Sequence, residues 1–307
     1  MRVENTPQIQ GFFAVILAAL LWAASGSSAK YLFNAGLSPF DLVQIRLTIA
    51  TACIGLLLAF RAPEKLRIPL KSLPGYLFLG ICGMAAMQAT YLLAISRIQV
   101  AAAILLQYLA PAFIALWQIC FQGHRLTLRT LIALCAALTG CALVLDLPAM
   151  QWRSMDLTGI LAGLAAALSF ALYSLAGEAR MQKEAPETVV FYAMLIACIL
   201  WHILLPPFSG FAALGNQDAS WILAMAIGSL GTALPFFLYL YGIRCIGAAP
   251  ASITGTLEPV FAGFLCFFFL SEILNIFQMT GATFVISAII LLQLPEKHPR
   301  HRKVSPS

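Results

Sequence analysis

The sequence predicts an all-α integral membrane protein with ten transmembrane helices, arranged as two inverted repeats of five helices. Hydrophobic residues make up 61% of the 307 residues and charged residues only 10%, against about 45–50% and 25% in soluble domains. Ten apolar segments follow one another, each close to the roughly 20 residues that a helix needs to cross the hydrocarbon layer. A long internal repeat divides these segments into two sets of five.

The repeat is clearest where residues 91–113 are laid over residues 239–261. Without a gap, at an offset of 148, the two stretches share nine identical positions out of 23. The shared residues include a tyrosine, a proline and the closing phenylalanine. Because 148 is about half of 307, we interpret the chain as a tandem duplication of one unit.

Each apolar segment is expected to be a helix, because backbone groups in lipid must be satisfied within the segment. Proline and glycine mark the connections, as at Gly36 and Pro39 or at Pro206 and Pro207. The first segment is longer than the apolar part of a signal peptide and has a partner in the repeat, so it is expected to remain in the protein. The expected helices are residues 11–33, 40–60, 74–96, 100–121, 128–147, 157–177, 187–206, 219–244, 248–270 and 275–294.

The positive charges orient the chain. With the N-terminus inside, fourteen of the 18 Lys and Arg residues fall in inside segments and three outside, at Lys30, Arg97 and Arg153. This bias predicts that both termini are cytoplasmic. Since five spans is an odd number, the second repeat enters the membrane from the opposite side, as in many alternating-access transporters. The expected units are residues 1–148, residues 149–296 and a basic cytoplasmic tail, residues 297–307.

Glu258 is a candidate for a functional charge within the membrane. It lies about ten residues into the ninth segment, roughly 15 Å deep, where the first repeat has Ala110. An acid at that depth costs on the order of 3 kcal/mol and needs a partner, a proton or water. Two interpretations stay open: a coupling or ligand-binding carboxylate, or a protonated glutamate that bonds a neighbouring backbone group.

Pro111 and Pro259 occupy mirrored positions near the middle of the fourth and ninth segments. Proline within a helix leaves the carbonyl four residues back without its donor. The freed carbonyls are expected at Gln107 and Gly255, which should therefore face protein or a watery cavity. The prolines are interpreted either as packing kinks or as residues that shape a cavity.

Arg46 is the second candidate charge, and it stands where the second repeat has Met194. It lies about 9 Å into its segment and must meet an anion or carbonyl groups. Lys30 and Asp41 lie near the same boundary. The three residues are predicted to form a gate, a structural ion-pair cluster or a substrate contact.

Further polar and aromatic residues occupy six of the segments and would suit a mid-sized amphipathic solute. Each of them also fits ordinary packing or a place in the interfacial belt. These candidates are Trp22, Ser25, Gln88, Tyr91, Gln107, Tyr108, Tyr173, Tyr239, Thr254 and Thr256.

Several classes of protein are excluded. The chain contains no Walker A, GxSxG or HExxH motif and no metal-ligand spacing, which argues against an ATP-driven pump, an intramembrane hydrolase or any other enzyme with a cofactor or metal. The eight cysteines form no CxxC pair, and we interpret them as small apolar side chains. No basic stripe with exposed aromatics points to nucleic acid. The expected partners are the lipid bilayer, a small metabolite and protons, and a monomer is favoured.

The chain also resembles the drug/metabolite transporter superfamily, specifically its ten-helix EamA-type members. The resemblance implies a bacterial inner-membrane carrier with cytoplasmic termini that often exports amino acids or other metabolites. It also implies a central cavity formed by helices 1, 3, 4, 6, 8 and 9. The resembling positions are residues 21–26, Lys30, Arg46 and residues 107–111 in the first repeat, and residues 257–261, Ser271, Glu272, Gln278 and Gly281 in the second.

The predicted function is secondary active transport of small organic metabolites by alternating access. Export of amino acids or amino-acid-like compounds is favoured on the family resemblance, and proton coupling through Glu258 is a hypothesis. The alternative is a channel-like or sensory membrane protein without a coupled transport cycle.

Overall fold

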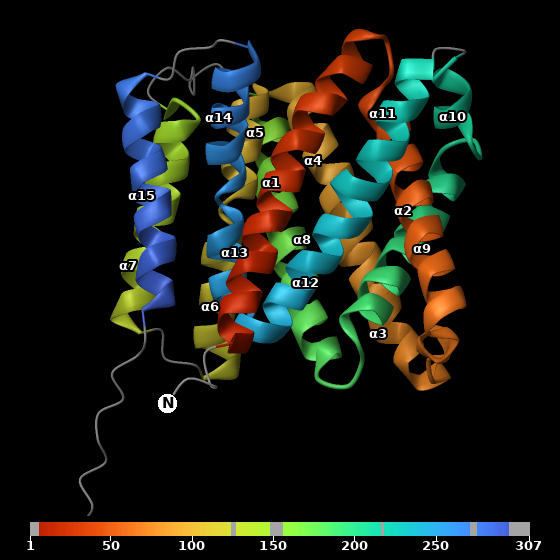
Figure 1. Ribbon diagram of the computed structural model, residues 1–307, viewed down its shortest axis with the longest axis horizontal. Coiled ribbons are helices and arrows are strands. Elements are labelled where there is room, and N and C mark those ends of the chain that lie inside the picture. The colour runs from red at the N-terminus through yellow and green to blue at the C-terminus, as the bar shows by residue number, and fades with distance from the viewer. Residues whose placement is uncertain (1–5, 124–126, 148–155, 216–217, 271–274, 295–307) are drawn as a thin grey trace, which may run out of the picture.

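The structure is a computed structural model that describes residues 6–123, 127–147, 156–215, 218–270 and 275–294. Within these residues the chain is helical, with no strand, and adopts the predicted ten-helix membrane fold. We call one end of the molecule the terminal end, because α1 (Thr6–Asn34) begins there and α15 (Ile276–Gln293) ends there (Figure 1). The opposite end is the far end. The predicted tail, Ser271 and Glu272 lie outside the described residues.

Large apolar side chains cover the outside of the bundle. Phe13 is 67% exposed and Ile203 73% exposed, and eight helical stretches are long and apolar enough to cross a membrane. A water-soluble protein rarely exposes apolar surface on this scale, so this face is suited to lipid.

The helix bounds follow the predicted segments closely, with two kinds of departure described below. In the first half they are α2 (Pro39–Arg61), η1 (Pro63–Leu66), η2 (Leu70–Ser72), α3 (Leu73–Phe78), η3 (Leu79–Ala85), α4 (Ala86–Arg97), α5 (Val100–Gln107), α6 (Ala110–Gln122) and α7 (Leu128–Val144). In the second half they are α8 (Leu157–Met181), α9 (Pro186–Leu204), α10 (Ser209–Ala213), α11 (Asp218–Gly228), η6 (Ser229–Ala233), α12 (Leu234–Ile246), α13 (Ala248–Gly255) and α14 (Glu258–Leu270).

The helices predicted at 100–121 and 248–270 are not continuous, which corrects that prediction. The first is broken after Gln107 and resumes at Ala110, and the second is broken after Gly255 and resumes at Glu258. The mirrored prolines explain the breaks, because a proline is tolerated in the first turn of a helix but not in its interior. Each break leaves the end of one half-helix and the start of another within the membrane layer.

A second irregularity was not predicted at all. The third span of each half contains a π-helical segment, η3 in the first half and η6 in the second. Such segments widen the helix locally and occur often at functional sites. At the offset of 148, η6 corresponds to residues 81–85, which lie within η3, so the irregularity belongs to the repeated unit.

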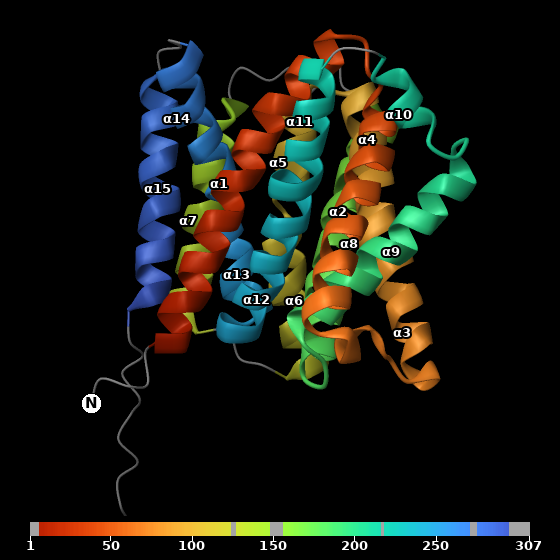
Figure 2. The ribbon, with the colours of Figure 1, turned by 45° about the vertical axis from the view of Figure 1, so that its right-hand side comes forward.

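The two halves are interleaved rather than set side by side. The first helix of each half packs on the third and fourth spans of the other, since α1 contacts α12, α13 and α14 while α8 contacts α4, α5 and α6. Bundle A is defined as α1, α2 and α11 to α14, and bundle B as α3 to α6, α8 and α9 (Figures 1 and 2). A site between the bundles therefore receives residues from both repeats.

Two symmetric helix pairs complete the fold: α2 with α9, and α7 with α15. In the second pair the backbones touch, because a Cβ added at Gly140 would lie 2.7 Å from the Gly281 carbonyl oxygen. Small residues allow such close approach in membranes. The α7–α15 pair stands at one side of the molecule (Figure 1).

Polar contacts link α2 and α9, and the segments that follow each of them, at both ends of the pair. At the terminal end, Lys65 Nζ lies 2.6 Å from Glu187 Oε1, and Tyr192 donates a 2.6 Å hydrogen bond to the Leu66 carbonyl. At the far end the buried Gln44 amide donates to the Pro206 carbonyl and accepts from the Gly210 N–H. This pair is thus held along its length.

Candidate functional site

A cavity of about 120 Å³ lies between bundle A and bundle B. Polar and aromatic side chains dominate its wall, and the ends of the broken helices form part of it. Bundle A contributes Trp22, Arg46, Phe236, Ser252, Gly255 and Glu258, and bundle B contributes Met87, Gln88, Tyr91, Gln107, Tyr108, Ala110, Pro111 and Phe170.

The cavity sits on the pseudo-two-fold axis that relates the repeats. Eight of its lining residues form four pairs at the offset of 148, so each wall mirrors the other. The pairs are Trp22 with Phe170, Gln88 with Phe236, Gln107 with Gly255, and Ala110 with Glu258.

Glu258 is the first residue of α14. The partial positive charge at a helix N-terminus stabilises an anion there, and the Tyr108 hydroxyl is in hydrogen-bonding reach of the carboxylate. Tyr91 and Arg46 are near enough to interact with it electrostatically. The mirrored helix α6 begins with Ala110 and has no such charge.

Arg46 is held in place from the second repeat. Its Nε donates to Thr232 Oγ1 at 3.1 Å, and the Thr232 hydroxyl donates to the Ile227 carbonyl at 2.8 Å. Thr232 belongs to η6, so the π-helical segment positions this contact. Among the described contacts the Nη groups of Arg46 have no hydrogen-bond partner, and they remain available at the cavity.

Gln88 is the third polar group of note. Its side chain is 5% exposed, and its Nε2 has no hydrogen-bond partner among the described residues. A buried donor without a partner is costly, and in a cavity wall it is placed to bond a solute or water.

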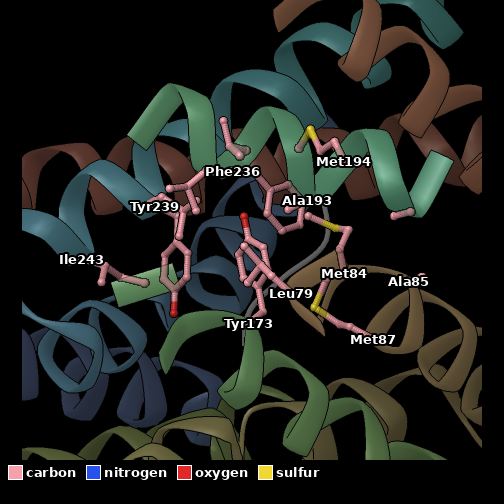
Figure 3. Packing of buried hydrophobic residues seen from close by; sticks show 14 of the residues in the cluster. Leu79, Met84, Ala85, Met87, Tyr173, Ala193, Met194, Phe236, Tyr239 and Ile243 are labelled. Carbon is pink, nitrogen blue, oxygen red and sulfur yellow. The ribbon is translucent and has the colours of Figure 1, made fainter. Parts of the chain in front are cut away.

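Aromatic rings separate the cavity from the terminal end. Trp22 lies 5.2 Å from Phe236 and 5.5 Å from Tyr239 between ring centroids, and Phe170 stacks on Tyr239 at 5.2 Å. Tyr173 meets Phe236 edge to face at 5.8 Å. We call these five residues the aromatic layer; Figure 3 shows Tyr173, Phe236 and Tyr239 together.

Below the aromatic layer, α8 and the α12–α13 turn form a set of contacts that we call the terminal gate. Tyr239 donates to Ser174 at 2.8 Å, because the Ser174 hydroxyl is itself donated to the Phe170 carbonyl. Glu178 Oε1 accepts from the Ala248 N–H at 3.0 Å, beside Gly247, whose φ of +85° suits glycine. At the far end of the described helices, α1 has no comparable packing on α4 or α5. The described contacts therefore close the cavity toward the terminal end, and the described helices show no comparable set of contacts at the far end.

The predicted site residues divide into three groups. Three of them are not among the residues that line the cavity: Tyr173 and Tyr239, which lie in the aromatic layer, and Thr254, whose hydroxyl donates to the Pro250 carbonyl. The predicted residues that do line it are Trp22, Arg46, Gln88, Tyr91, Gln107, Tyr108 and Glu258.

The third group is the predicted Lys30, Asp41 and Arg46 cluster. Asp41 accepts a 2.7 Å hydrogen bond from Ser38, and no ion pair joins it to Arg46 within the described residues. The Lys30 side chain lies outside the described residues. The described contacts thus direct Arg46 to Thr232 and the cavity rather than to Asp41.

Phe170 and Phe236 were missed. Both are mirror positions of predicted residues, Trp22 and Gln88, so applying the offset to the predicted set would have found them. Thr232 gave no such signal, because its mirror position is Met84.

The two-repeat arrangement of the fold agrees with a comparison to known protein families. The model of the EamA-like transporter family matches residues 9–146 and residues 157–294. The chain belongs to the EamA-like transporter family. The resemblance stated from the motifs is confirmed, and the two matches are again 148 residues apart.

Relatives of this EamA-like chain are named as transporters. An uncharacterized transporter of Archaeoglobus fulgidus is 31% identical over 66% of this chain and 70% of its own length. The uncharacterized inner membrane transporter YicL of Salmonella typhimurium is 28% identical over 94% of this chain and 96% of its own length. The threonine/homoserine exporter RhtA of Salmonella typhimurium is 27% identical over 89% of this chain and 88% of its own length.

One solved crystal structure has the same fold. It superposes with a TM-score of 0.74 over 94% of this chain and 98% of that chain, at 21% identity. The ten-helix arrangement of two EamA-like repeats is therefore a known architecture.

Proposed function

We propose that this protein is a secondary transporter that carries a small organic metabolite across a membrane by alternating access. One observation carries the proposal: a cavity on the pseudo-symmetry axis, between interleaved bundles, is closed by packed side chains toward the terminal end, with no comparable packing of α1 on α4 or α5 among the described residues. Inverted repeats create a second state in which the opposite end is closed.

The contacts of that second state follow from the offset of 148. The pairs Ser174–Tyr239 and Glu178–Ala248 of the terminal gate correspond to Gly26–Tyr91 and Lys30–Val100. Between them, Gly177 packs closely on Leu240, and this pair corresponds to Ala29–Leu92. In the proposed cycle, bundle A rocks against bundle B, so that α1 closes on α4 and α5 while α12 leaves α8.

The terminal end is proposed to be cytoplasmic, because the positively charged segments gather there. Under this orientation the described state opens away from the cytoplasm. A bacterial inner membrane is the proposed location, supported by the name of the YicL relative.

The proposed solute is an amino acid or a similar small compound, and the proposed direction is export. A cavity of about 120 Å³ is small beside the roughly 300–1,000 Å³ of drug-sized pockets. The RhtA relatives are named threonine/homoserine exporters. Size and similarity therefore support the same class of solute.

Proton coupling is proposed at Glu258, because it is the one carboxylate among the described residues that line the cavity. Its exchange of a proton would be linked to solute movement. Glu258→Gln is then expected to remove the dependence of transport on a pH gradient, measured in vesicles; a gradient dependence equal to that of the wild type contradicts this role.

The test of the function uses purified protein in liposomes loaded with unlabelled threonine. Uptake of labelled threonine is expected to saturate and to be stimulated by threonine on the opposite side. A channel, the alternative function, instead gives flux that does not saturate and is not stimulated from the other side.

A further inference from the structure

We propose that the cavity recognises a zwitterion, with Arg46 binding the carboxylate and Glu258 binding the ammonium group of the same solute. The inference rests on the proposed transport function and adds the charges of the solute and its orientation. It assigns each charged side chain a separate subsite.

The first argument is that the two charges share a cavity without pairing. Opposite charges attract strongly away from bulk water, and a buried charge without a counterpart is expensive. Yet Arg46 and Glu258 form no ion pair within 4.0 Å among the described residues. Both lie in the cavity wall and interact electrostatically without close contact, so a zwitterionic guest can bind each of them at close range.

The second argument is the presentation of Arg46. Thr232 Oγ1 accepts a 3.1 Å hydrogen bond from Arg46 Nε, and the hydrogen bond that the Thr232 hydroxyl donates to the Ile227 carbonyl holds this oxygen in place. The guanidinium is thereby oriented with its Nη groups unpaired among the described residues. A planar guanidinium binds a carboxylate through two parallel hydrogen bonds, so this edge is prepared for that group.

The third argument is the environment of Glu258. Glu258 begins α14, where the helix N-terminus favours an anion, and the Tyr108 hydroxyl is within hydrogen-bonding reach of its carboxyl group. Burial opposes the negative charge of this carboxyl group, so an ammonium group bound beside it in the cavity stabilises the ionised form.

The fourth argument comes from the broken symmetry. The mirror positions of Arg46 and Thr232 are Met194 and Met84, which lie in the same buried cluster (Figure 3). Packing alone is thus satisfied by two methionines at these positions, and the mirror of Glu258 is Ala110. Both charged residues, Arg46 and Glu258, lie on bundle A, whereas bundle B contributes the neutral donor Gln88.

The pairing predicts strong discrimination by charge. A solute with only one of the two charges leaves the other cavity charge without a partner. We expect threonine to be transported at least about 10-fold better, by kcat/KM, than threoninamide or N-acetylthreonine, since 1.4 kcal/mol corresponds to tenfold. Measurements at pH 6.5 keep the amine of threoninamide protonated.

The experiment measures transport of threonine, threoninamide and N-acetylthreonine by cavity variants in proteoliposomes. Glu258→Gln is expected to reduce the preference for threonine over N-acetylthreonine at least about 10-fold, because the ammonium subsite is neutral. Arg46→Met, which copies the mirror residue, is expected to reduce the preference over threoninamide by a similar factor. Thr232→Val keeps both charges and is expected to raise the KM for threonine and N-acetylthreonine but not for threoninamide.

The control variant is Glu178→Gln, which removes a charge from the terminal gate while keeping an acceptor for Ala248. It is expected to leave the order of the three probes unchanged. If the wild type shows no saturable threonine flux, the proposed function fails. If it carries threonine but the cavity variants change all three probes equally, the zwitterion inference is overturned and the transport function stands.

Discussion

Replacing Glu178 with alanine is expected to open the terminal gate. Glu178 on bundle B accepts the first N–H of α13 on bundle A, at Ala248. A side chain that caps a helix N-terminus contributes about 0.5–2 kcal/mol, which corresponds to a shift of about 2- to 30-fold between the two states. Glu178→Lys, which copies Lys30 at the mirror position, is expected to shift the equilibrium further, because it adds a cation at that N-terminus.

The assay is the labelling of a single cysteine in the cavity wall, Ser252→Cys, in a variant without the eight native cysteines. An impermeant maleimide is added from either side of oriented vesicles. For Glu178→Ala, labelling from the terminal side should rise by about 2- to 30-fold, and labelling from the far side should fall. Glu178→Gln serves as the control with a smaller shift. If Glu178→Ala labels like the wild type from both sides, the reasoning on the gate is refuted.

Three further substitutions test the packing of the fold. Gly140→Val should destabilise the purified protein by about 1–3 kcal/mol, because the new side chain meets the Gly281 backbone. Leu131→Val, on the exposed face of α7, is the control and should leave the stability nearly unchanged. Gln44→Leu should cost about 1–3 kcal/mol for each backbone group left unpaired, also read from the melting temperature. Lys65→Ala should cost under about 1 kcal/mol, since its ion pair is part-exposed; a larger loss in a melting experiment would contradict that view of the contact.

The helices could be predicted because their signal is local. Twenty apolar residues between breakers such as Gly36 and Pro39 specify a span whatever surrounds it. The internal offset of 148 then indicated the symmetry between the halves, and seven of the fourteen residues that line the cavity were among the predicted candidates. Trp22, Gln107 and Glu258 were found by their type and depth alone.

The remaining features depend on tertiary contacts that no short stretch encodes. Whether Pro111 kinks a helix or ends it depends on what can satisfy the freed backbone groups nearby. Asp41 was closer to Arg46 in sequence, but Thr232, 186 residues away, takes the hydrogen bond. Tyr239 looked like a cavity residue, and only the packing of α12 on α8 places it in the aromatic layer.

The interrupted helices have a consequence for how this protein is probed. Gln107 and Gly255, which end α5 and α13, line the cavity, and the proline four residues after each cannot donate a hydrogen bond to its carbonyl. Replacing Gln107 itself with alanine leaves this acceptor unchanged, because the substitution alters only the side chain. Pro111→Ala instead returns the missing N–H, so it withdraws a main-chain acceptor while removing only ring atoms.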